Sequence, residues 1–337
     1  MDNKFNFNSL NDEQSTYITL ISYIDINDAG IKILENGGAI NVSELYLYLE
    51  NPDCPYFGKL LFADKGLSKL DSFRGKHSPL SITDAEMVAH MIEIGLGNIQ
   101  ITANRNECGL FSSGFKAFAL KDSFGNVGIS YCGSNVDATK GALREWLEAN
   151  VLEYFRGTSA QVQQAQDFFD KYKHLDGKTY VYGASLGGNL SQHIYKQNYN
   201  EIARVFTVNG NPINQKALDT PEKIAAFNNP EKASFNVIGG DIVGLLKNCD
   251  LYPDTVHYIK NNGKLRDLGG LESHLLEAAT YDENHNFVTI TREEALDLLT
   301  PTLDKFTEFT RYTRDKLNEI GSKHSAKAKN GSDKVKK

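Results

Sequence analysis

The stretch that decides the fold is "KTYVYGASLGGNLSQHIYKQ", residues 178–197. It begins with a β-prone run over residues 179–182, passes through Gly-Ala-Ser-Leu-Gly-Gly, and continues with apolar residues at helical spacing. A β-prone run, a glycine-rich turn and a helical pattern in direct succession predict a strand that leads into a helix. The stretch therefore favours an α/β fold, and Ser185 at the turn is the first candidate for a functional residue.

The same alternation continues along the chain. Residues 115–120 and 127–131 predict a β-hairpin, and further strands are expected over 204–208, 234–238 and 256–260. Strands that alternate with helices of about 10 to 15 residues imply parallel pairing. We expect a mostly parallel central sheet with helices on both faces.

Three parts are expected along the chain. Residues 1–110 are polar and mostly helical in pattern, and predict a helical layer or cap. Residues 111–320 carry the predicted strands and form the α/β core. Residues 321–337 are rich in lysine and poor in apolar residues, so a disordered basic tail is expected there.

Composition narrows the class of protein. With 40% hydrophobic and 23% charged residues, the chain has the composition of a soluble globular protein. A net charge of -7 argues against nucleic-acid binding as its main role. The chain shows no apolar run of the roughly 18 residues that cross a bilayer, and its polar start lacks the features of a cleavable signal. Cytoplasmic residence is the default expectation, and export without such a signal stays open.

The cysteines give no sign of a metal or redox site. The four residues are Cys54, Cys108, Cys132 and Cys249, and none forms a Cys-x-x-Cys pair. We expect buried structural thiols. No metal or organic cofactor is expected.

Gly183-Ala184-Ser185-Leu186-Gly187, called the elbow below, fits the pattern G-x-S-x-G. In this pattern a nucleophilic serine occupies a strained turn between strand and helix, and glycines on both sides avoid a clash. Because the motif is short, the alternative is a glycine turn with an idle serine. The predicted strand before the elbow and the helix after it favour the nucleophile.

A serine hydroxyl becomes a good nucleophile only beside a base, which in turn needs a carboxylate to orient it. In open α/β hydrolases the chain order is Ser, then Asp or Glu, then His. Asp241 follows the predicted strand 234–238 through two glycines and is the preferred acid. Asp250 and Asp254 are the alternatives.

The preferred base is His274, which follows a long loop and directly precedes a helical pattern. His257 lies inside a predicted strand and is the alternative. His285 belongs to a polar turn, and His324 to the tail.

Acyl transfer also requires donors that hold a developing oxyanion. The N–H of Leu186, at the start of the predicted helix, is one candidate. Ser134 follows the strand 127–131 and is the second, through its N–H or hydroxyl; the alternative is a plain turn.

Three segments together resemble a known family. "YGASLGGNL" (182–190), "ISYCGSN" (129–135) with downstream "REWLEAN" (144–150), and "VIGGDIVGLL" (237–246) resemble motifs of the class 3 (fungal-type) lipases and their bacterial lipase-like relatives. The motifs are the G-x-S-L-G-G elbow, the F-R-G-T oxyanion strand with its D-W, and the G-D-x-V segment.

The resemblance implies an α/β-hydrolase fold that acts on acyl esters. It places Ser185, Asp241 and His274 at the catalytic positions and Ser134 at the oxyanion position. Two residues depart from the family pattern: Ala184 stands where His is frequent, and Cys132 where Arg is common.

The expected function is a serine ester hydrolase of lipase or phospholipase type that forms an acyl-enzyme. Its substrate would be a lipid or another acyl ester, with peripheral membrane contact. "REWLEANVLEYFRG", residues 144–157, is amphipathic and fits either a lid or a core element.

Two other functions stay open. One is an exported bacterial lipid-degrading effector or toxin. The other is a binding protein on a hydrolase scaffold, since a fold does not fix a function; its protein partner is not indicated by the sequence.

Overall fold

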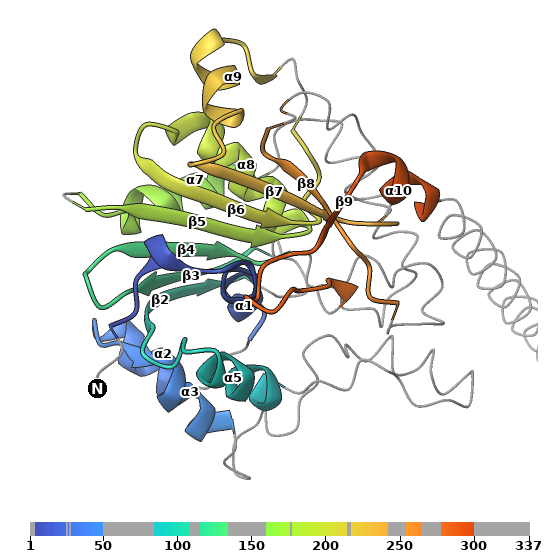
Figure 1. The fold of residues 1–337 in the computed structure, drawn as a ribbon. Coiled ribbons are helices and arrows are strands. Elements are labelled where there is room, and N and C mark those ends of the chain that lie inside the picture. The colour runs from blue at the N-terminus through green and yellow to red at the C-terminus, as the bar shows by residue number, and fades with distance from the viewer. Residues whose placement is uncertain are drawn as a thin grey trace, which may run out of the picture.

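The computed structural model describes residues 4–24, 26, 28–49, 84–107, 115–133, 160–175, 177–213, 217–241, 252, 254–263 and 278–299. Within this part of the chain, the strands form one nine-stranded sheet that carries helices on both faces (Figure 1). The expectation of an α/β fold is confirmed at this level, but the sheet is mixed and not mostly parallel, because antiparallel strands extend it on both sides of the parallel ones.

The strands follow one another across the sheet in the order of the chain. Their bounds are β1 Ile40–Asn41, β2 Gln100–Asn106, β3 Lys116–Lys121, β4 Val127–Tyr131, β5 Thr179–Ala184, β6 Ile202–Val208, β7 Ala233–Ile238, β8 Val256–Ile259 and β9 Thr289–Ile290. The neighbours from β4 to β8 pair in parallel, and the remaining neighbours are antiparallel. Five strands therefore end at the same edge of the sheet, called the C-terminal edge below.

The helices cover the two faces of this sheet separately. Their bounds are α1 Asp12–Ile21, α2 Asp28–Glu35, α3 Val42–Leu49, α5 Asp84–Glu93, α7 Ala160–Tyr172, α8 Leu186–Asn198, α9 Pro221–Phe227 and α10 Arg292–Asp297, with a 3-10 turn at Phe7–Ser9. Helix α1 contacts β4, β5 and β6 on one face, and α7 and α8 pack together on the other. No helix among the described residues is both long and apolar enough to cross a membrane.

Strand β5 shows how the sheet separates two cores. Tyr180, Tyr182 and Ala184 belong to the core beneath α1, whereas Val181 belongs to the core beneath α8. Successive side chains of a strand point to opposite faces. Because both faces are covered, every residue of β5 is buried, and the strand is continuously apolar apart from its first residue and Gly183.

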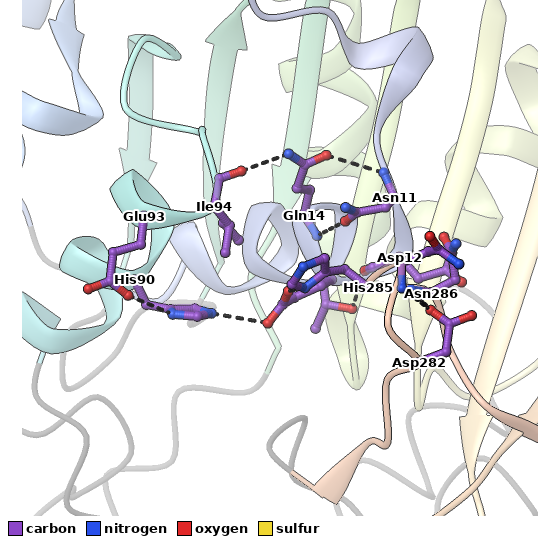
Figure 2. Close-up of polar contacts among 12 residues, drawn as sticks. Asn11, Asp12, Gln14, His90, Glu93, Ile94, Asp282, His285 and Asn286 are labelled. Carbon is purple, nitrogen blue, oxygen red and sulfur yellow. Dashed lines mark hydrogen bonds and ion pairs between the residues drawn. The ribbon is translucent and has the colours of Figure 1, made fainter.

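Helix α1 begins at a capping box. The Asn11 side chain accepts a hydrogen bond from the Gln14 N–H at 2.8 Å, and the Gln14 side chain accepts one from the Asn11 N–H at 3.2 Å. The Gln14 amide also donates to the Ile94 carbonyl at 2.7 Å, beyond the end of α5 (Figure 2). The cap that starts α1 thus also attaches it to the neighbouring helix.

A carboxylate in the first turn of α1 connects distant parts of the chain. Glu13 lies 3.1 Å from Nε2 of His90 on α5 and 2.6 Å from Nδ1 of His285, which belongs to a turn between β8 and β9. We call these three residues the Glu13 clasp. Asp12 adds a hydrogen bond at 2.9 Å from the Phe287 N–H. The clasp joins α1 to α5 and to the C-terminal part of the sheet (Figure 2).

The predicted strands between residues 115 and 260 are present as β3 to β8. The helical interpretation of the first third missed β1 and β2, which extend the same sheet. In β2 only Ile101 and Ala103 are buried apolar residues, so its alternation is too weak to read. The strand 256–260 is followed by a further strand, β9, and by helix α10.

Candidate active site

Ser185 lies between β5 and α8 with φ 55° and ψ −126°. Among the described residues, only two other non-glycine residues have positive φ: Asn209 and His285. Such a conformation costs about 1–3 kcal/mol and persists only where the surroundings impose it. Here the Ser185 N–H donates to the Val208 carbonyl at 3.0 Å, and the Ser185 carbonyl accepts the Asn189 N–H at 3.1 Å.

The glycines around Ser185 are required by space. A Cβ atom on Gly183 would overlap the Gly187 carbonyl, and one on Gly187 would overlap the Tyr131 carbonyl at the end of β4. A Cβ atom on Gly188 would lie 2.8 Å from the Cα of Gly210. The turn is therefore packed backbone to backbone, and a side chain at these positions would require the neighbouring backbone to move.

The start of α8 points its unsatisfied N–H groups toward the turn. The helix begins at Leu186, directly after Ser185, and the Ser185 side chain does not cap it. The N-terminus of a helix carries a partial positive charge of roughly half an electron. Leu186 thus lies where its N–H can stabilise negative charge that develops beside Ser185.

Asp241 lies at the same edge, beyond the end of β7. Its side chain is fully buried. Its N–H donates to the Ile238 carbonyl at 2.9 Å, and the preceding Gly239 N–H donates to the Ile259 carbonyl at 2.8 Å. One strand, β6, separates β7 from β5, so the strand ends that carry Ser185 and Asp241 are about 10 Å apart. The structure brings both residues to the C-terminal edge.

The end of β4 packs directly against the elbow. The Gly133 N–H donates to the Tyr23 hydroxyl at 3.0 Å, and this hydroxyl donates to the Ala184 carbonyl at 3.5 Å. A Cβ atom on Gly133 would lie 3.2 Å from the Cβ of Ser185. Ser134, the next residue and the expected oxyanion group, lies outside the described residues.

Tyr23 is a site neighbour that sequence reasoning missed. It follows α1, and its carbonyl accepts a hydrogen bond at 2.8 Å from Nζ of Lys116, a buried lysine on β3. No motif surrounds Tyr23, and its contacts with Gly133 cross 110 positions of sequence. Only the assembled sheet reveals its place.

His274 lies outside the described residues, as do Asp250, His324 and the segment 144–157. The described ends on either side of His274 lie together, because the Asn262 N–H donates to the Ala278 carbonyl at 2.8 Å and Asn261 bridges to Ala279. Both ends follow β8 at the C-terminal edge, next to the end of β7 that carries Asp241.

The alternative residues lie elsewhere. Asp254 precedes β8 and is therefore at the opposite edge from Ser185. His257 lies within β8, where burial lowers its pKa and the charge of Asp12 partly opposes this change. His285 belongs to the Glu13 clasp.

Two further observations concern metals and thiols. No group of three or more His, Cys, Asp or Glu side chains in the described part of the chain is arranged to hold a metal ion. Cys132, between the end of β4 and Gly133, is buried.

Comparisons with known proteins add little to this geometry. No family model matches the chain, and no curated protein matches it. Among solved structures the chain is similar to Lip2 lipase from Yarrowia lipolytica, with 13% sequence identity, 51% of this chain and 68% of that chain covered, and a TM-score of 0.34. A likeness at this level assigns neither fold family nor activity, so the site itself must support any functional conclusion.

Proposed function

We propose that this chain is a serine ester hydrolase of lipase or phospholipase type, built on an α/β-hydrolase fold. The observation that carries the proposal is the strained backbone of Ser185, held in a glycine turn between a buried parallel strand and a helix. This is the arrangement that G-x-S-x-G chemistry requires. A serine without a role at a turn would not require a backbone conformation of this cost.

In the proposed reaction, Ser185 Oγ attacks the acyl carbonyl while His274 takes the serine proton. His274 then gives this proton to the leaving alcohol, and Asp241 orients the imidazole and stabilises its charge. The N–H of Leu186 and the Ser134 group hold the oxyanion. Water releases the acyl group in a second, equivalent step. The scheme uses no metal or organic cofactor.

The position and burial of Asp241 support its part in this scheme. A buried carboxylate is costly unless it is paired or hydrogen-bonded, and an imidazolium would be a suitable partner. The roughly 10 Å between the two strand ends leaves space for one imidazole between a serine and an aspartate side chain. We propose a lipid or other acyl ester as substrate, met at a membrane surface.

The test compares the wild-type protein with Ser185→Ala on p-nitrophenyl esters of several chain lengths and on phospholipid vesicles. Ser185→Ala should lower turnover by a factor on the order of a million if the three residues act as a unit. Ser123→Ala is the matched control, because Ser123 lies in the β3–β4 turn at the opposite edge, and it should keep full activity.

Covalent labelling distinguishes the nucleophile Ser185 from the residues that activate it. A fluorophosphonate probe should label the wild-type protein and Ser123→Ala, and should not label Ser185→Ala. His274→Ala and Asp241→Ala should slow both labelling and hydrolysis. Equal hydrolysis by the wild type and Ser185→Ala would overturn the proposal.

A further inference from the structure

Asn209 ends β6 in a conformation that few residues adopt. Its φ is 51°, and its side chain is fully buried. It lies at the C-terminal edge, on the strand between those that carry Ser185 and Asp241. Asparagine enters the left-handed region more readily than other side chains, but glycine does so at lower cost. The side chain must therefore be explained by its contacts.

Those contacts continue the hydrogen bonding between β6 and β7 beyond their last paired residues. Paired residues of β6 and β7 end at Val208 and Asn236. The Asn209 N–H donates to the Asn236 carbonyl at 2.8 Å, and the Asn209 Oδ1 accepts the Ile238 N–H at 2.8 Å. The Asn209 side-chain oxygen thus accepts a hydrogen bond from the end of β7, beyond the last backbone pair of β6 and β7.

The same contacts link the two proposed catalytic residues through the backbone. The Ser185 N–H donates to the carbonyl of Val208, which is bonded to Asn209. On the other side, Ile238 donates to Asn209 and accepts the Asp241 N–H at 2.9 Å. Asn209 therefore lies on a path of hydrogen bonds and intervening covalent bonds that runs from the peptide of Ser185 to the peptide of Asp241.

We propose that Asn209 is a positioning residue that fixes Asp241 relative to Ser185. This inference rests on the proposed hydrolase function. A neutral hydrogen bond contributes modestly to stability, whereas a displacement of about 1 Å in a catalytic group can cost on the order of 100-fold in rate. Loss of the Asn209 side chain should therefore affect turnover far more than folding.

The decisive variant is Asn209→Gly, which keeps the left-handed backbone and removes the side chain that carries the acceptor. We expect kcat for p-nitrophenyl ester hydrolysis to fall roughly 10- to 100-fold with KM unchanged. We also expect the acidic limb of the kcat/KM profile to move to lower pH, because a displaced carboxylate no longer stabilises the protonated base. A purely structural role would not move this limb.

His285→Gly is the matched control. It also removes a side chain at a left-handed position, but within the Glu13 clasp, so kcat and the pH profile should stay those of the wild type. Circular dichroism verifies that both variants are folded. Wild-type kcat and an unmoved acidic limb in folded Asn209→Gly would overturn the inference.

If Asn209→Gly does not fold, Asn209→Asp decides the question, because it keeps an acceptor and tolerates positive φ. A kcat within about tenfold of the wild type supports positioning, and a kcat as low as that of Asp241→Ala contradicts it. Failure of the proposed function is recognised separately, because Ser185→Ala would then match the wild type whatever the Asn209 variants do.

Discussion

A methyl group is too large for the position that Gly187 occupies, because it would overlap the Tyr131 carbonyl. We predict that Gly187→Ala lowers the free energy of unfolding by about 1–3 kcal/mol, the usual range for forced overpacking, and abolishes fluorophosphonate labelling of Ser185. Urea unfolding measures the first effect, and gel-based labelling the second.

Gly37→Ala separates packing from backbone strain. Gly37 has a φ of 75° and open space where a Cβ would lie, so its replacement costs about 1–2 kcal/mol from the left-handed conformation alone. It should leave labelling intact. Loss of labelling in both variants would show that general destabilisation, and not the geometry of the elbow, controls Ser185.

The sequence indicated the residues of the site that carry their own local signals. Ser185 and its glycines form a motif, and Asp241 follows a readable strand through two glycines; the structure has both at the C-terminal edge. Tyr23 and Asn209 have no such signal, because their importance comes from contacts with strands that are distant in the chain. Long-range packing of this kind leaves no local pattern to read.

Helix α8 carries a histidine that should make stability depend on pH. Burial, with a smaller effect of the nearby Lys196 charge, lowers the pKa of His193 to about 4. The unfolded chain has an ordinary histidine pKa of about 6.5, so it binds a proton between pH 6.5 and 4 that the folded protein does not. The stability contribution is complete above pH 6.5 and is lost as the pH falls toward 4.

We predict that His193→Gln reduces the loss of unfolding free energy between pH 7 and pH 4.5 by on the order of 2 kcal/mol. Urea unfolding at both pH values measures this difference. A residual loss is expected, because burial also lowers the pKa of His257. An identical pH dependence in the wild type and in His193→Gln would contradict the assignment.

Elements differ in how well they can be predicted, and burial explains the difference. Every residue of β5 and of β7 is buried, so apolar and β-prone residues make up most of both strands. Strands β1 and β9 have two residues each, too few to show a period. Hydrogen bonds to neighbouring strands, and not side-chain patterns, define such short elements.

The Glu13 clasp ties the molecule together across most of its sequence, since Glu13 and His285 are separated by 272 positions. We predict that Glu13→Gln lowers the free energy of unfolding by about 1 kcal/mol at neutral pH. The substitution replaces a largely buried carboxylate, which contacts two imidazoles, by an uncharged amide. Urea unfolding measures this loss.

Glu93→Gln is the matched control for the clasp. Glu93 also contacts His90, but its side chain is 74% exposed against 13% for Glu13. An exposed ion pair contributes little, so the control should stay within about 0.5 kcal/mol of the wild type. Equal losses of unfolding free energy in the two variants would show that the Glu13 contacts contribute no more than an exposed ion pair.

The sequential order of the strands also bears on how the chain is made. During synthesis each new strand meets a neighbour that has already left the ribosome, so the sheet can grow by addition at one advancing margin. Helix α1 is made early but rests on β4, β5 and β6, so its contacts with the sheet are complete only after residue 208 has emerged. The face of the sheet beneath α1 is therefore fully covered only after β6 is made, and the turn at His285 contacts this helix later still.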